Sequence, residues 1–126
     1  MNPETELEAR VWKLFFDDTE LFNDYGVNFL RPPLKAVAFA AKLVRDAQRI
    51  AGKPIWVMFV SSVDIGVWLS HTINGRRFTL ASYEDQHFIY YGEGKNYWAV
   101  PATPENFIEK IEWVNSAECN QLPLPM

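Results

Sequence analysis

The sequence predicts an α+β domain, in which an antiparallel meander of four to five strands packs against about three helices in the order α-α-β-β-β-β-(β)-α. Two segments with helical spacing of apolar residues come first, short alternating runs follow around Asn74-Gly75, and a third helical segment ends the pattern. With 126 residues, 48% of them hydrophobic, the chain is long enough for one domain with its own core. We therefore expect residues 1–126 to form a single domain, with residues 117–126 as a loose C-terminal tail.

The first helix is expected over residues 4–16, because its glutamates suit the positive end of a helix dipole and its apolar residues share one face. That face holds Leu7, Val11, Leu14 and Phe15. Residues 17–32 combine turn formers with large apolar side chains, so we expect a long loop that packs on the core.

A second helix is expected from Pro33 to Gly52, since proline suits the first helical position and glycine suits the C-terminal cap. Its core stripe is expected to contain Leu34, Val37, Ala41, Val44 and Ala47, widened by Phe39, Leu43 and Ile50. Its basic residues gather on another side of the helix: Lys35, Lys42, Arg45 and Arg49.

Two runs, "PIWVMFVSS" and "GVWLSHTINGRRFTLAS", predict the first three strands. The first run is apolar on both faces, which favours a central strand or one covered on both sides. The second predicts a hairpin with a type I′ turn at Asn74-Gly75, which sets Leu69 opposite Leu80. The expected core face of this hairpin holds Val67, Leu69, His71, Phe78 and Leu80.

The remaining runs are expected to complete the sheet and add a third helix. "HFIYYG" pairs back through a turn at Asp85-Gln86, and "NYWAV" is the optional fifth strand. Thr103 and Pro104 have the residue types of an N-cap and a first helical position. The last helix is then expected over residues 104–116, with Phe107, Ile108, Ile111 and Val114 toward the core.

The charge layout permits two interpretations. The net charge is −4, and a basic block at residues 31–53 lies between two acidic segments. One interpretation is a nucleic-acid surface formed by Lys35, Lys42, Arg45 and Arg49. The other, which we favour, is a helix whose charges face acidic neighbours within the fold, because a net negative protein repels phosphate backbones.

Catalytic and metal-binding chemistry finds little support in the sequence. The two histidines and the single cysteine, Cys119, have no metal-ligand spacing, so we expect no metal, no cofactor, no catalytic residue and no enzymatic activity. One cysteine cannot form an internal disulfide, and the polar N-terminus is unlike a signal peptide. With no apolar run long enough to span a bilayer, a cytoplasmic location without membrane contact is expected.

A resemblance rests on a few residues and their order: Tyr25, Gly26, Gly66, Gly75 and Arg76. With "NDYGV" before the helix and a Gly-Arg pair in the hairpin, the chain resembles small uncharacterised bacterial proteins that carry an Asp-Gly-Tyr-Gly-Ala-like segment. The resemblance covers residues 22–115 and implies the same order of elements, without implying an activity or a functional residue. The chain departs from that pattern at Phe22-Asn23, where such proteins tend to have Trp-Asp, and at His71, where a tryptophan is common.

Aromatic residues give the main functional hypothesis. If all helices cover one face of the sheet, the other face exposes aromatic side chains, which are typical of binding surfaces. We expect a non-catalytic protein-binding module, such as an adaptor, inhibitor, immunity protein or antitoxin of bacterial or phage type, whose partner is another protein or a second copy. Its expected binding residues are Trp68, Tyr83, Phe88, Tyr90, Trp98 and Tyr25.

Two alternatives remain open at this stage. One is a small-ligand or enzymatic site between residues 17–32 and the sheet, using His71 or Tyr25. The other is nucleic-acid binding through the basic side of the second helix, which the net negative charge disfavours.

Overall fold

The computed structural model describes residues 4–16, 32–63 and 66–119. Three helices and five strands follow one another in the expected α+β order, and the optional fifth strand is present. Their bounds are α1 Glu6–Phe16, α2 Leu34–Ala51, β1 Phe59–Val63, β2 Gly66–Ile73, β3 Arg76–Ser82, β4 His87–Glu93, β5 Asn96–Pro101 and α3 Pro104–Cys119.

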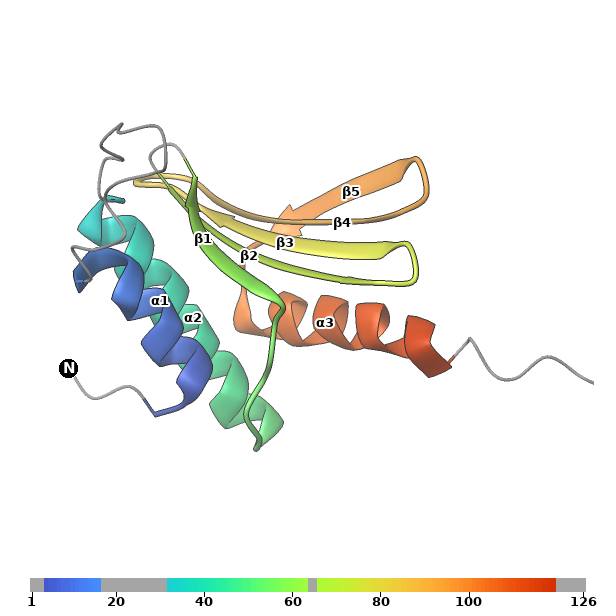
Figure 1. Ribbon diagram of the computed structural model, residues 1–126, viewed down its shortest axis with the longest axis horizontal. Coiled ribbons are helices and arrows are strands. Elements are labelled where there is room, and N and C mark those ends of the chain that lie inside the picture. The colour runs from blue at the N-terminus through green and yellow to red at the C-terminus, as the bar shows by residue number, and fades with distance from the viewer. Residues whose placement is uncertain (1–3, 17–31, 64–65, 120–126) are drawn as a thin grey trace, which may run out of the picture.

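The described elements form two layers. The strands make one antiparallel meander in the order β1-β2-β3-β4-β5, and the three helices lie on the same face of it (Figure 1). Helix α1 packs along α2, and α3 crosses beneath β2, β3 and β4. Within the described ranges no helix covers the opposite face, which we call the open face; the other is the helix-covered face.

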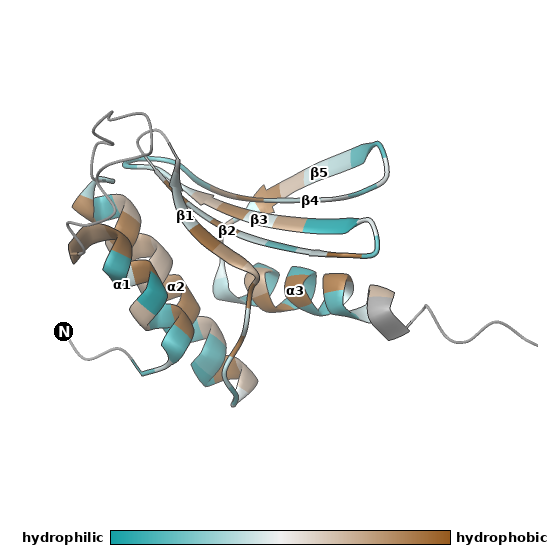
Figure 2. Cartoon of the chain, in the orientation of Figure 1, coloured by the Kyte–Doolittle hydropathy of each residue, from teal (hydrophilic) through white to brown (hydrophobic). Residues whose placement is uncertain are grey.

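The core lies between the helices and the helix-covered face. Val37 and Val44 of α2, Leu69 and Leu80 of the hairpin, and Phe107 of α3 are fully buried in it. Hydrophobic and hydrophilic stretches alternate along the helices in Figure 2, as expected for helices that are covered on one side. None of these helices combines the length and the apolar composition needed to cross a membrane, within the residues that the structure describes.

The C-terminal cap predicted for α2 is confirmed, and part of its predicted core stripe is wrong. Gly52 has a left-handed φ of 71°, and its N–H donates to the Gln48 carbonyl at 2.8 Å. Pro33 is the N-cap residue, so α2 begins at Leu34, one residue after its expected start. Leu34 and Ile50 are exposed, because they lie in the first and last turns, at the margins of the packed layer.

Strand β1 corrects the expectation of a central strand, since it lies at the edge of the sheet. The apolar run divides in two: Val57 is buried in the preceding connection, and Phe59 is exposed on the strand. The Arg10 guanidinium of α1 donates to the carbonyls of Val57 and Met58 at 2.9 and 3.1 Å. A side chain thus satisfies backbone acceptors that a neighbouring strand would satisfy in a sheet centre.

The β2–β3 hairpin is confirmed in turn type and register. Asn74 and Gly75 have φ of 51° and 87°, as a type I′ turn requires, and Leu69 pairs with Leu80. All five residues of its expected core face are buried. The next turn was placed wrongly, at Asp85-Gln86.

That turn is centred on Glu84-Asp85. The Tyr83 N–H donates to the Gln86 carbonyl at 2.8 Å, and Ser82 pairs with His87. Aspartate is common in turns, and Asp85 belongs to both the expected and the observed turn, so composition alone does not fix its centre.

Helix α3 confirms its N-cap and extends past its expected end. The Asn106 N–H donates to the Thr103 hydroxyl at 3.1 Å. The helix continues to Cys119, so residues 117–119 are helical and were wrongly assigned to the tail. Residues 120–126 lie outside the described part of the chain.

Candidate functional site

The open face carries a cluster of aromatic side chains. Strand alternation directs one aromatic residue from β1, one from β2, two from β4 and one from β5 to this side. Phe59 and Tyr97 are each 65% exposed, Tyr90 is 42% exposed and Phe88 is 36% exposed. We call this set the aromatic face: Phe59, Trp68, Phe88, Tyr90 and Tyr97.

Trp68 and Tyr83 are joined at one end of the aromatic face. The Trp68 indole Nε1 donates to the Tyr83 hydroxyl at 3.0 Å, and both side chains are half-buried. A Cβ on Gly66 would lie 2.4 Å from Tyr83 Cδ1, so only glycine leaves room for this ring. Both expected binding residues therefore lie on the open face, where the hydrogen bond fixes their orientation.

At the other end, Arg77 lies over Tyr97. The guanidinium carbon is 4.4 Å from the ring centroid, and Nη2 donates to the Gly94 carbonyl at 2.7 Å. Gly92 makes space for this pair, because a Cβ there would lie 3.0 Å from Tyr97 Cδ1 and 2.4 Å from the Asn96 carbonyl oxygen.

The expectation for Trp98 is wrong. This residue lies on the helix-covered face and not with the other expected binding residues on the open face. It pairs with Tyr91, so it follows the helix-covered side, and the two rings stack at 5.4 Å. Tyr91 in turn contacts the edge of Trp113 on α3 at 5.6 Å. The sequence contained the signal for the right residue, since Tyr97 precedes Trp98 and neighbours on a strand take opposite faces.

Two further residues, one outside the expected set and one within it, have different outcomes. Phe59 was missed because its run was interpreted as a two-sided central strand. Tyr25 lies outside the described residues.

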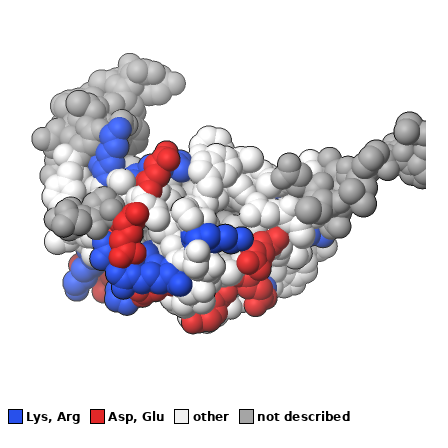
Figure 3. Space-filling model, turned by 90° about the horizontal axis from the view of Figure 1, so that it is seen from below, with Lys and Arg blue, Asp and Glu red and all other residues white. Residues whose placement is uncertain are grey.

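The basic side of α2 faces the acidic side of α1. Arg45 holds the buried Glu8 carboxylate through Nε at 3.1 Å and Nη2 at 2.5 Å, and Arg49 holds Glu4 in the same two-pronged way. Lys42 pairs with Asp46 at 2.7 Å within α2. Figure 3 shows basic and acidic side chains next to one another on the surface seen from below.

These pairs also shift protonation equilibria. The hydrogen bond from Arg49 holds the pKa of Glu4 below its usual value, and the hydrogen bond to Glu8 raises the pKa of Arg45. The cations of this helix thus serve contacts within the fold, while Lys35 lies exposed near its start.

His71 is fully enclosed on the helix-covered face. It is 2% exposed, its Nε2 lies 2.8 Å from Asn115 Oδ1, and Trp56 meets its ring edge-on at 5.5 Å. Because the amide oxygen only accepts, Nε2 of His71 is the donor in this hydrogen bond. Nδ1 is buried with no hydrogen-bond partner among the described atoms.

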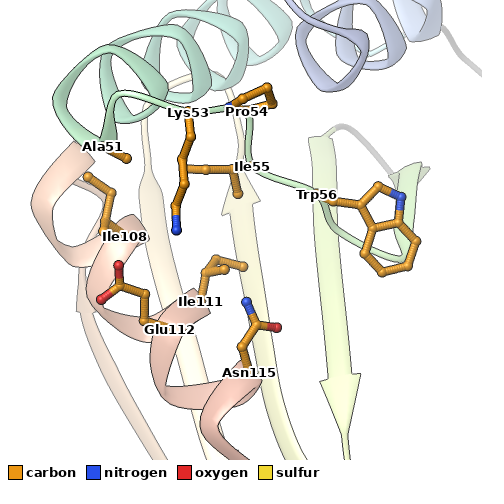
Figure 4. A pocket seen from close by; sticks show the side chains of 9 residues that line it. All are labelled: Ala51, Lys53, Pro54, Ile55, Trp56, Ile108, Ile111, Glu112 and Asn115. Carbon is orange, nitrogen blue, oxygen red and sulfur yellow. The ribbon is translucent and has the colours of Figure 1, made fainter. Parts of the chain in front are cut away.

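A small pocket lies beside this pair. It has a volume of about 210 Å³ and is formed by the end of α2, the segment that follows it and one side of α3. Figure 4 shows the Lys53 side chain extending into the pocket toward Ile111 and Glu112, with Asn115 at the margin. This pocket is lined by α3 and residues 51–56, and His71 is not among its lining residues. The ligand site expected between residues 17–32 and the sheet stays a prediction, because residues 17–31 lie outside the described part of the chain.

His87, the first residue of β4, makes contacts with α2 and β3. Its ring stacks on Phe39 at 3.6 Å, and its Nδ1 lies 2.9 Å from the Ser82 hydroxyl. That hydroxyl donates to the Ala36 carbonyl at 2.9 Å, so Nδ1–H must donate to it. Burial lowers the pKa of His87 below 6.5.

No family model matches the sequence, and the searches of curated proteins and of solved structures returned no match either. In the described ranges, no three histidine, cysteine, aspartate or glutamate side chains come together in a way that could hold a metal ion.

Proposed function

We propose that the protein is a non-catalytic protein-binding module that binds its partner through the aromatic face. The observation that carries this proposal is the group of exposed aromatic rings on the side of the sheet opposite the helices. Rings of this kind bury much apolar area at a low cost in side-chain entropy, which is why they dominate binding energies. The proposed role is that of an adaptor, inhibitor, immunity protein or antitoxin that acts in the bacterial cytoplasm.

The surroundings of the rings suit a protein partner. Hydroxyl groups of Ser70, Thr72 and Thr79 lie between the rings on the same face and offer hydrogen bonds to a partner backbone. Among the described residues of this face the one cation is Arg77, and it is engaged with Tyr97 and Gly94, so the face is largely apolar in character. A surface of this composition fits an apolar protein surface better than a phosphate backbone.

Photo-crosslinking tests this proposal. A photoreactive phenylalanine at Tyr90 is expected to capture the partner in the native cell, whereas the same group at Phe16 is not. Phe16 is the matched control because it is an exposed aromatic on α1, away from the aromatic face. Equal capture from both positions, or capture from neither, would refute the proposal.

The captured partner then permits a measurement of affinity. Tyr90→Ala is expected to weaken binding about 30-fold, which corresponds to about 2 kcal/mol for a hot-spot aromatic. Phe16→Ala should leave the affinity unchanged. An unchanged affinity for Tyr90→Ala would contradict a role of this face.

A second candidate function is the binding of a small apolar amino acid in the pocket of Figure 4. The ammonium of Lys53 and the carboxylate of Glu112 flank an apolar lining that includes Ile108 and Ile111, an arrangement that matches a zwitterion with an aliphatic side chain. Leucine should shift the NMR signals of Ile108 and Ile111, and Lys53→Met should abolish that shift while Lys42→Met does not. Equal shifts with isopentylamine, which lacks the carboxylate, would exclude this function.

A further inference from the structure

Strand β5 presents an unprotected edge. It has β4 on one side and, within the described residues, no strand on the other, and Figure 1 shows it at the outer margin of the sheet. Five of its six residues are exposed, and it pairs with β4 from end to end without a bulge. The opposite edge differs, because α1 lies against β1 and Arg10 occupies two carbonyls just before it.

The sequence of β5 lacks the features that keep edges apart. Natural edge strands are usually blunted by charged residues, proline or bulges. β5 reads "NYWAVP", so it carries no charge and its only proline is its last residue. Two exposed aromatic residues follow each other in it, Tyr97 on the open face and Trp98 on the helix-covered face.

The turn before β5 determines which backbone groups point outward. Gly94 and Lys95 form a two-residue turn that closes on the pair of Glu93 and Asn96, with Gly94 at a φ of 62°. Such a turn makes its closing pair hydrogen-bonded, and the pattern then alternates along the strand. The N–H and C=O groups of Tyr97 therefore point away from β4.

The same alternation gives Ala99 an outward N–H and C=O. Pro101 is next in the series, but it has no N–H, and its carbonyl already accepts from the Thr103 N–H and from Asn106 Nδ2, both at 3.0 Å. The edge thus offers two donors and two acceptors, all on Tyr97 and Ala99.

We propose that β5 pairs antiparallel with β5 of a second copy, with Trp98 on the two-fold axis. In this register Tyr97 lies opposite the partner's Ala99, and each exchanges both backbone hydrogen bonds with the other, so all the outward groups are satisfied. A register centred on Ala99 sets Tyr97 against the partner's Pro101, which has neither a free donor nor a free acceptor. The two sheets join into one, with five strands from each copy.

Side chains favour the same register. On the open face the large side chain of Tyr97 lies beside the small side chain of the partner's Ala99. On the other face Trp98 lies beside the partner's Trp98. Because β5 is uncharged, no like charges meet across the new pair, although each chain carries a net charge of −4. This inference concerns the sheet edge and stands whether or not the aromatic face binds a protein.

Ala99→Pro tests the pairing. It removes an N–H that points away from β4, so the internal ladder is kept and proline is tolerated at such an edge position. Wild-type protein is expected to dimerise over a concentration series in sedimentation experiments, and Ala99→Pro is expected to stay monomeric with unchanged circular dichroism. Ala99→Ser, which keeps the N–H, should still dimerise.

A disulfide trap tests the register without relying on a proline. In a Cys119→Ser background, Trp98→Cys should crosslink under mild oxidation, because opposite residues of a non-hydrogen-bonded pair have Cα atoms about 4.5 Å apart. Tyr97→Cys should not, since the two copies of that residue are more than about 7 Å apart in this register.

Three outcomes of these two experiments overturn the proposal. These outcomes are a wild-type monomer at all concentrations, a dimer that survives Ala99→Pro, and crosslinking through Tyr97→Cys in place of Trp98→Cys. Tyr90→Ala separates the two proposals, because it should impair partner capture and leave the dimer intact. Loss of the dimer in Tyr90→Ala would identify the aromatic face as the dimer interface and overturn the β5 pairing.

Discussion

At the scale of single residues, the Ser82 hydroxyl connects three elements. It donates to Ala36 on α2 and accepts from His87 on β4, while itself belonging to β3. His87 is further held by the Phe39 ring. A titratable group thereby lies within the packing between helix and sheet, which couples stability to pH.

His87→Phe should reduce the loss of stability at low pH. The folded pKa lies below 6.5, so the unfolded chain binds this proton more readily. The stabilisation is therefore full above 6.5 and is lost as the pH falls toward the folded pKa. Urea midpoints measured at about pH 7 and about pH 5 should differ less in the variant, whose phenyl ring keeps the stack on Phe39. An unchanged difference would contradict this role of His87.

Gly75→Val should destabilise the protein through backbone strain alone. A Cβ at Gly75 would meet no atom within 4 Å, whereas its φ of 87° disfavours a β-branched residue. We expect a loss of about 1–2 kcal/mol in urea melts. Asn74→Gly is the control, because that position also has a positive φ and glycine adopts it freely. Equal melts for Gly75→Val and wild type would show that the turn is not type I′ in solution.

At the scale of elements, the two faces of a strand proved easier to predict than its partners. The turn after β3 was placed one residue late, which shifts the pairing of β3 and β4 by two residues. Because side chains alternate with a period of two, Ile89 still faces the core and Phe88 still faces away. The predicted pattern of burial is therefore correct, although the predicted pairing of β3 with β4 is wrong.

The errors that did matter concern boundaries. The predicted face of Trp98 is wrong because the sequence alone does not fix how β5 pairs with β4. The apolar run around Phe59 is predicted as one strand, whereas it is a connection followed by a strand. Local sequence determines turn residues and helix caps, as at Gly75 and Thr103. The place of a strand within the sheet depends on contacts far along the chain, such as those that Arg10 makes.

The two faces of the sheet should respond differently to truncation. Leu80 is fully buried between Leu69 and Ile89, so Leu80→Ala should cost roughly 2–5 kcal/mol in denaturant melts. Tyr90→Ala, one strand away on the open face, should change the stability of the isolated chain much less. If Tyr90→Ala unfolds the chain as badly as Leu80→Ala does, the aromatic face is part of a core.

At the scale of the whole molecule, the charges of α1 and α2 cancel across their contact. Arg45 and Arg49 meet Glu8 and Glu4, so two cations of the basic block form ion pairs between the two helices. The long-range field that remains reflects the net charge of −4.

Replacing Lys42, Arg45 and Arg49 by glutamine should therefore lower stability and leave retention on a nucleic-acid column unchanged. The loss of stability follows because the buried carboxylate of Glu8 would lose its cation. Thermal melts and column retention on the same preparation check both parts. Strong wild-type retention that disappears in the variant would instead support the nucleic-acid hypothesis.

The two-layer arrangement has a consequence for how this chain can change over evolutionary time. Each strand carries two interleaved sets of positions, one that maintains the fold and one that faces outward. Substitutions in the outward set, such as at Thr79 or Tyr90, leave the hydrophobic core between Leu80 and α3 untouched. If the aromatic face binds a partner as proposed, a lineage can therefore change that partner by successive outward substitutions without passing through unfolded intermediates. Diversity among future relatives should concentrate on alternate residues of the same strands.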